Sequence, residues 1–210
     1  MSATAVSLST APSHQGPLDL RLVIEWLARD GVISPAGAQR PLARGARVES
    51  PQPPLVRLAA VAMTRESDGK PLDVEMLTQW LAARAGLPYL RIDPLKVDVG
   101  KVADTMSAAY AERHKVLPVQ VTPNEVVVAT SEPFITDWVS EVERQSRRGV
   151  RRVVSSPADI QRFTTEFYSL AKSVRAAQKA GGASTAASFE QLVELGKSNK
   201  QLDANDQSVV

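Results

Sequence analysis

The chain has 210 residues, of which 43% are hydrophobic and 5% aromatic, and it contains no cysteine. Its formal net charge of +2 is too small to predict a nucleic-acid-binding surface, and the lack of cysteine excludes disulfides, thiolate metal sites and a cysteine nucleophile. The composition therefore favours one or two small domains with mainly aliphatic cores.

The first 17 residues are small and polar, and they include no Lys or Arg. A secretory signal would need a basic start and an apolar stretch, so we predict a disordered arm over residues 1–17. No window approaches the roughly 18 consecutive apolar residues that a membrane span needs. We therefore expect a soluble chain that associates with a membrane only through a partner.

Residues 18–86 are predicted to form a helical subdomain of two hairpins. Leu20, Ile24 and Leu27 recur on one helical face of the first hairpin. In the second hairpin, a short helical pattern at 55–63 is followed by a helix that Asp73 can cap. The first half of the chain is therefore expected to be all helical.

Residues 87–170 switch repeatedly between a hydrophobic period of 2 and one of 3.6, which indicates alternating strands and helices. The expected elements are a strand at 89–92, a helix from Val99 to His114 capped by Asp98, a hairpin of VLPVQVT and EVVVAT, a helix opening at Glu132-Pro133, a strand VRRVV, and a helix opening at Ser156-Pro157. EVVVAT and VRRVV are expected to be parallel neighbours, because a helix joins them. The predicted fold class is α+β: helical hairpins followed by a small three- to four-stranded α/β domain with helices packed on the sheet.

The segments GLPYLRID, ERHKVLPV, VVVATSEP and SSPADIQRFTTEFY occur in this order. Together they resemble the amino-terminal domain of the type II secretion and type IV pilus assembly ATPases of the GspE/PilB/PulE type, over about residues 18–170. The resemblance implies a non-catalytic docking and regulatory region that binds the cytoplasmic domain of a GspL-like inner-membrane platform protein. It also implies a cytoplasmic location, peripheral at the inner membrane, and a second partner in the ATPase core of the same chain.

Residues 171–210 are expected to comprise a helix extension, a flexible linker and the beginning of an absent ATPase core. Gly196-Lys197-Ser198 imitates the end of a phosphate-binding loop, but Gln191 stands where that loop needs a glycine. ATP and Mg are therefore expected only in the absent core. No catalytic residue, resident cofactor or metal ligand is assigned to this chain.

In the resembled family, helical hairpins of this kind can form a cyclic di-GMP receptor that begins with an Arg-Leu-Gly pattern. Arg21-Leu22 and Arg57-Leu58 come nearest to it, but Val23 and Ala59 replace the glycine, and a Cβ obstructs close approach of a ligand to the backbone. A cyclic di-GMP sensor therefore stands as the alternative function. The other interpretation of these arginines is that they lie on solvated helix faces.

Four residues of the first helix are the candidate partner-binding surface. Trp26 lies off the apolar stripe, and Arg21, Glu25 and Arg29 follow one another at i,i+4 spacing. Interfaces are rich in aromatic and arginine anchors, which favours docking here. The alternative is that Trp26 packs against the second hairpin.

A second candidate surface is basic, for an anionic ligand or a partner. It consists of five arginines within nine residues, Arg144, Arg147, Arg148, Arg151 and Arg152. Guanidinium groups bind carboxylate and phosphate bidentately, but a solvated helix end and a charge-protected edge strand explain the cluster as well. No aromatic residue is interleaved with these arginines, which argues against single-stranded nucleic acid.

Overall fold

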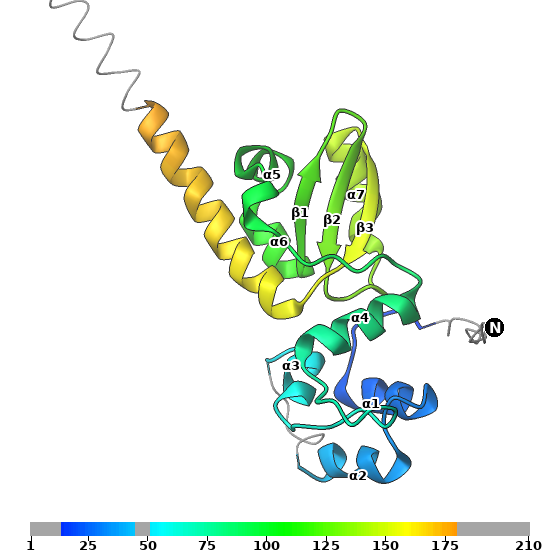
Figure 1. Ribbon diagram of the computed structural model, residues 1–210. Coiled ribbons are helices and arrows are strands. Elements are labelled where there is room, and N and C mark those ends of the chain that lie inside the picture. Colours follow the sequence, from blue (N-terminus) through cyan, green and yellow to red (C-terminus); the bar gives the residue numbers. More distant parts are fainter. Residues whose placement is uncertain (1–13, 45–50, 180–210) are drawn as a thin grey trace, which may run out of the picture. The chain divides into compact units, whose positions relative to one another are not determined.

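A computed structural model describes residues 14–44 and 51–179 of the chain (Figure 1). The described residues up to Tyr168 form one compact unit, and those from Ser169 to residue 179 belong to a second. Residues 169–179 of the second unit are helical. Most of the predicted disordered arm lies outside the described residues, as do the predicted linker and the Gly196-Lys197-Ser198 sequence.

The first half of the compact unit is helical, as predicted. Its helices are α1 (Leu20–Arg29), α2 (Pro35–Arg44), α3 (Pro54–Ala59) and α4 (Val74–Ala85). Aspartates cap two of them: Asp19 accepts a hydrogen bond from the Leu22 amide, and Asp73 accepts one from the Met76 amide, both at 2.8 Å. Helix α3 ends at Ala59, earlier than the predicted 55–63 pattern. The helices bury a shared aliphatic core that includes Ile24, Leu27, Leu55, Leu58, Leu77 and Leu81.

The second half contains a three-stranded sheet in the order β1-β2-β3. Its elements are the 3₁₀ turn η1 (Pro94–Lys96), α5 (Val99–Thr105), α6 (Ala108–His114), β1 (Val116–Val121), β2 (Glu125–Thr130), α7 (Asp137–Ser146) and β3 (Gly149–Val154), followed by a closing helix from residue 157. Strands β1 and β2 are antiparallel, and β2 and β3 are parallel, so both predicted pairings are confirmed. The predicted α+β class is confirmed as well.

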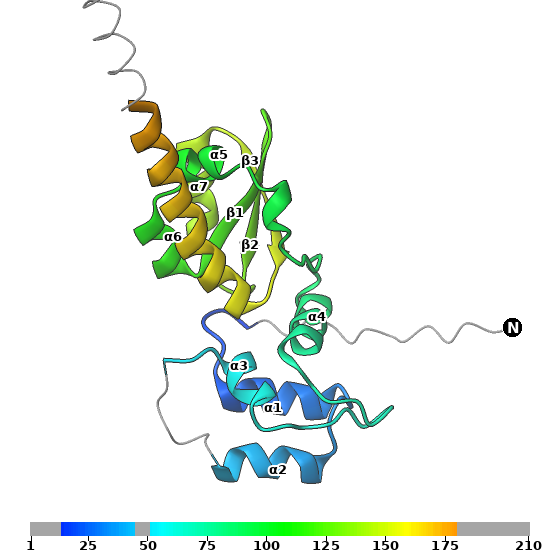
Figure 2. The same ribbon diagram turned by 60° about the vertical axis from the view of Figure 1, so that its left-hand side comes forward.

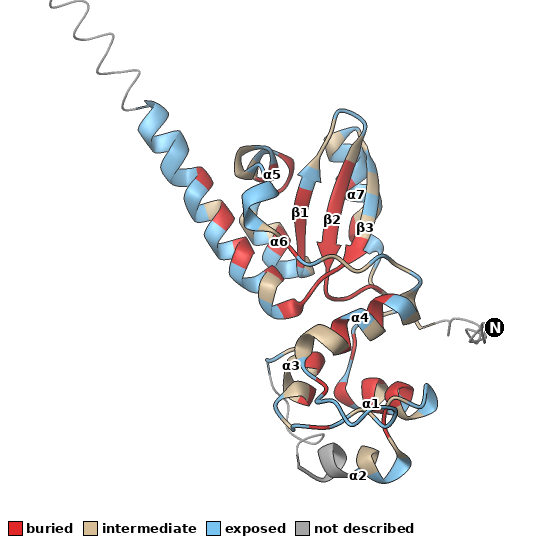
Figure 3. Ribbon diagram, viewed as in Figure 1, coloured by how far each residue is buried: buried red, intermediate tan, exposed pale blue. Residues whose placement is uncertain are grey.

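Helices cover both faces of this sheet (Figures 1 and 2). One face packs against Ile160, Phe163 and Phe167 of the closing helix and against Val102 of α5. The other face packs against α6 and against α7, where Trp138 is 1% exposed. Figure 3 shows that the central strand β2 is buried almost throughout, which agrees with its continuous apolar sequence.

The predicted strand at 89–92 is only a short bridge. Tyr89 pairs with Val154 in a parallel bridge, flanked by hydrogen bonds from the Leu90 amide to the Val154 carbonyl and from the Val154 amide to the Pro88 carbonyl, both at 2.8 Å. Asp93-Pro94 then turns the chain into η1. The segment therefore extends β3 only at its last residue.

The predicted single helix from Val99 to His114 is two helices. Met106 is extended, with φ −148° and ψ 144°, and it is buried against the sheet. Ser107 then accepts a hydrogen bond from the Tyr110 amide at 3.3 Å and caps α6. Burial of Met106 and the serine cap together turn the chain between the two helices. The predicted Asp98 cap of the first helix is confirmed by its bond to the Lys101 amide at 3.1 Å.

The predicted helix start at Glu132-Pro133 is wrong, because α7 begins at Asp137. Glu132 lies in the β2–α7 loop, and its side chain is only 4% exposed. It is held there by a backbone amide and by Lys115, both distant in sequence. Those contacts replace the helical conformation that Glu-Pro would favour locally.

The outer edge of β3 is protected by a side chain of the adjacent helix. The Val150 amide donates a hydrogen bond to Glu143 Oε1 of α7 at 3.2 Å. The charged Arg151 and Arg152 follow it on the same strand. Charge and a side-chain acceptor therefore cover part of this edge, in agreement with the structural interpretation of the arginine cluster.

Arg147→Gly is expected to stabilise the protein by roughly 0.5–1 kcal/mol. Arg147 ends α7 in the left-handed conformation, with φ 54°, where a Cβ is unfavourable. Thermal unfolding followed by circular dichroism measures the change, and Arg144→Gly, inside the same helix, is the control that should destabilise. Equal destabilisation by both changes would contradict this account.

Candidate functional site

Helix α1 presents a row of alternating charges to solvent. Arg21, Glu25 and Arg29 are exposed, while Val23, Ile24 and Leu27 on the other faces are fully buried. Among the described residues, the three charged side chains have no ion pair or hydrogen bond. This row can therefore form new ion pairs without first breaking intramolecular ones.

Trp26 does not lie on this exposed face. Its side chain is 3% exposed, and its ring makes edge-on contacts with His14 at 5.4 Å and Phe134 at 5.3 Å between centroids. Trp26 is therefore packed inside the protein and does not share the exposed face of Arg21, Glu25 and Arg29. On the side of the second hairpin, the Arg84 guanidinium lies 4.4 Å from the Trp26 ring centroid, and Trp26 shares a hydrophobic core with residues of that hairpin.

A polar cluster of Asp30, Trp80 and Arg84 joins α1 to α4. The Arg84 side chain is 9% exposed, and its Nη1 donates to both carboxylate oxygens of Asp30 at 2.6 Å. The Trp80 indole donates to the same carboxylate at 3.0 Å. Arg84 Nε is buried without a hydrogen-bond partner among the described residues. Only the acid after α1 and the base in the last turn of α4, fifty-four positions apart, hinted at this pair.

The two Arg-Leu pairs lie in helices that pack against each other. Arg21 is exposed and Leu22 half-buried in α1, whereas in α3 Arg57 is half-buried and Leu58 is 1% exposed. Arg57 already has an interaction within the protein. The two pairs therefore have different surroundings and do not form two equivalent ligand-binding edges.

The five clustered arginines are divided by the structure. Arg144 and Arg147 are exposed at the end of α7, and Arg148 is half-buried, with a buried Nε that has no described hydrogen-bond partner. Arg151 pairs with Glu125 of β2 at 3.0 Å, and Arg152 donates to the Pro133 carbonyl at 3.0 Å. Because successive residues of a strand point to opposite faces, Arg151 and Arg152 start from opposite sides of the sheet.

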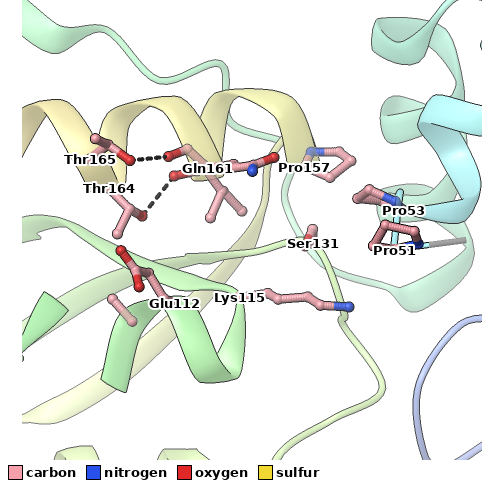
Figure 4. Close-up of a pocket in the computed structure, with 11 residues that line it drawn as sticks. Pro51, Pro53, Glu112, Lys115, Ser131, Pro157, Gln161, Thr164 and Thr165 are labelled. Atoms are coloured by element: carbon pink, nitrogen blue, oxygen red, sulfur yellow. Dashed lines mark hydrogen bonds between the residues drawn. The ribbon is translucent and has the colours of Figure 1, made fainter. Parts of the chain in front are cut away.

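A polar pocket of about 450 Å³ lies where the segment before α3 meets the α/β half (Figure 4). Its walls include Pro51, Pro53, Lys115 and Ser131, together with one face of the closing helix, Pro157, Ile160, Gln161, Thr164 and Thr165. Figure 4 shows the Lys115 side chain extending toward the two prolines. Lys115 Nζ also lies 3.3 Å from Glu132, so the pocket borders the ion pair of that buried carboxylate.

Tyrosine hydroxyls make further contacts between elements. The Tyr168 hydroxyl donates to the Met106 carbonyl at 2.8 Å, and burial raises the pKa of Tyr168 to about 12. The Tyr89 hydroxyl donates to Glu75 of α4, and desolvation by burial followed by this hydrogen bond raises the pKa of Tyr89. Both phenols therefore remain neutral donors at physiological pH.

The part of the chain that the structure describes holds no group of three or more His, Asp or Glu side chains placed to bind a metal ion. Within residues 14–44 and 51–179, no helix combines the length and the apolar character that crossing a membrane demands.

Residues 85–174 match the family model of the MshEN domain. The chain is 38% identical over 143 residues to the type IV pilus assembly ATPase TfpB of Acinetobacter baylyi. These aligned residues cover 67% of this chain and 24% of the relative. The chain thus spans about a quarter of the length of that relative.

Two solved structures are similar in part. The structure of MshE with cdg matches 70% of this chain and 98% of its own, at 17% identity and a TM-score of 0.49. The amino-terminal domain of XpsE matches 72% of this chain and 97% of its own, at 16% identity and a TM-score of 0.40.

Proposed function

Because this chain is a relative of the amino-terminal domain of the type II secretion and type IV pilus assembly ATPases, we propose that it is a non-catalytic docking and regulatory region. Its partner is the cytoplasmic domain of a GspL-like inner-membrane platform protein, and the protein is cytoplasmic and peripheral at that membrane through this partner. ATP and Mg act in an ATPase core of the same protein.

The unpaired charged row on α1 is the observation that supports docking. Arg21, Glu25 and Arg29 are exposed, and no described residue pairs with them. Their backbone is held in place, because the opposite side of α1 is buried in the helical core. A rigid helix with alternating charges favours a partner surface on which opposite charges alternate at the same spacing. Such complementarity aligns the two surfaces and speeds association.

Reversal of two charges tests this surface. Arg21→Glu with Arg29→Glu should weaken binding to the platform domain by about tenfold or more, which corresponds to about 1.4 kcal/mol. Thermal stability should change little, since both side chains are exposed. Isothermal titration with the purified platform domain measures the affinity.

The matched control reverses two exposed arginines of the other candidate surface, Arg144→Glu with Arg147→Glu. It should leave the affinity unchanged. If this control weakens binding and the α1 variant does not, the partner docks on the end of α7 and the α1 assignment is wrong.

Cyclic di-GMP binding is the second candidate function, favoured by the Arg-Leu pairs in the packed helices α1 and α3. The missing glycines and the unequal burial of the pairs count against it. Titration of the chain with cyclic di-GMP, with ATP and GTP as controls, distinguishes the proposals. Micromolar binding that Arg21→Ala or Arg57→Ala abolishes would establish a sensor in place of a purely docking role.

A further inference from the structure

The segment that leads into α1, residues 14–18, lies against the loop between β2 and α7 (Figure 2, where this segment is blue). The Leu18 amide donates to Glu132 Oε2 at 2.8 Å. The Gly16 amide approaches the Phe134 carbonyl at 3.5 Å. The start of the helical half is thereby attached to a loop of the α/β half.

Glu132 depends on this attachment for its hydrogen bonding. Its side chain is 4% exposed, and its second oxygen lies 3.3 Å from Lys115 Nζ, while the Lys115 side chain is 52% exposed. A buried carboxylate is unfavourable unless charge and hydrogen-bond partners compensate for lost water. Two partners, the Leu18 amide at one carboxylate oxygen and Lys115 at the other, supply that compensation.

Three rings complete the same junction. His14, Trp26 and Phe134 contact one another edge-on, with centroid separations of 5.3 to 5.5 Å. One ring belongs to residues 14–18, one to α1 and one to the β2–α7 loop. If residues 14–18 withdraw, His14 leaves the cluster, but Trp26 and Phe134 can remain in contact.

We infer that residues 14–18 act as a latch, which joins the helical half to the α/β half through Glu132 and opens without unfolding either half. The latch reaches the loop through two hydrogen bonds, from the Leu18 amide to Glu132 and from the Gly16 amide to the Phe134 carbonyl, and through the ring of His14. The sheet, in contrast, has hydrogen-bonded ladders on both sides of β2. Water can replace the Leu18 amide at Glu132 once the segment moves away. The open state therefore leaves the carboxylate hydrated and still close to Lys115.

The consequence of opening is communication between the halves. A second contact joins the halves without the latch, because Val154 of β3 is buried in the hydrophobic core of the helical half. Opening therefore loosens one attachment and lets the helical half move about the contact that remains. Within the proposed function, on which this consequence rests, a partner bound to α1 is sensed by the α/β half through this change.

Amide hydrogen exchange measured by NMR on the whole chain tests the latch without any partner, so its result is independent of the docking proposal. In Glu132→Ala, the Leu18 amide should lose at least tenfold of its protection. The Leu90 amide and the β2 amides, such as Val127, should keep theirs. Equal loss at all three positions would mean general destabilisation, and no loss at Leu18 would mean that Glu132 does not hold the segment; either result overturns the inference.

Two further variants keep the test decisive if Glu132→Ala folds poorly. Lys115→Met leaves the carboxylate in place but removes its cation, and it should lower protection at Leu18 by a smaller factor than Glu132→Ala does. Glu125→Ala is the matched control, because Glu125 is an exposed carboxylate of the neighbouring strand paired with Arg151. If Glu125→Ala exposes Leu18 as much as Lys115→Met does, the latch assignment is wrong.

Discussion

Trp26→Ala is expected to lower the free energy of unfolding by about 3–5 kcal/mol. The indole is 3% exposed and lies between Phe134, His14 and the Arg84 guanidinium. Its removal leaves a cavity where the helical half meets the β2–α7 loop, and Arg84 loses the aromatic face beneath it. Thermal and urea unfolding followed by circular dichroism should show the loss, at roughly 2–4 °C in Tm for each kcal/mol.

Trp80→Ala is the matched comparison, because Trp80 is half-buried and its indole bonds to Asp30. It should cost clearly less than Trp26→Ala. Trp26→Ala should reduce binding of the platform domain only to the extent that part of the variant is unfolded. The folded fraction should bind with unchanged affinity. A Trp26→Ala variant that is stable but binds the platform domain weakly would instead show that Trp26 is a docking anchor.

Asp30→Ala is expected to cost about 3 kcal/mol of unfolding free energy, because it leaves a buried cation without its partner. Arg84 is 9% exposed, and Asp30 accepts both of its described hydrogen bonds as well as that of the Trp80 indole. Urea unfolding measures the change. Asp30→Asn, which retains an acceptor for Trp80, should cost less than alanine.

Glu125→Gln serves as the reference ion-pair deletion. Glu125 and Arg151 have side chains 39% and 48% exposed, so this surface pair should contribute only about 0–1 kcal/mol. If Asp30→Ala costs no more than Glu125→Gln, the polar cluster does not hold α1 to α4.

The parts of the fold that could be predicted are those with local causes. The β1–β2 hairpin follows from two apolar runs around Pro123-Asn124, and the parallel pairing of β3 follows from the helix that joins it to β2. The caps at Asp73 and Asp98 were also predictable, because the capping side chain acts within three residues.

The parts that could not be predicted depend on contacts between distant segments. Glu132-Pro133 has the local pattern of a helix start, and nothing nearby indicates that the Leu18 amide, 114 positions away, will hold the carboxylate. Trp26 was placed off the apolar stripe correctly, but its burial depends on Phe134, which covers a second side of α1. A helical pattern can assign a residue to one face of a helix. It cannot predict how many faces of that helix are buried by the rest of the protein.

The arginine cluster is divided in the structure for another reason. The five arginines are close in sequence, but they belong to the end of a helix and to a strand. In the strand, successive side chains point to opposite faces. Arg151 and Arg152 therefore found different partners, Glu125 and the Pro133 carbonyl. Residues that are close in sequence are predicted to share a surface only when they belong to one element. Their spacing must also match the repeat of that element, which is about 3.6 residues in a helix and 2 in a strand.

The bond between Glu143 and the Val150 amide has a consequence for the behaviour of the protein in concentrated solution. An additional strand aligned on β3 would need that amide as a donor, and it would have to displace a carboxylate that is already bound there. The arginines beside it would also have to be brought close to the arginines of any identical copy that approached. Edge-to-edge stacking into a continuous sheet is therefore disfavoured from this side, and a filament or precipitate of folded chains would have to grow through another surface.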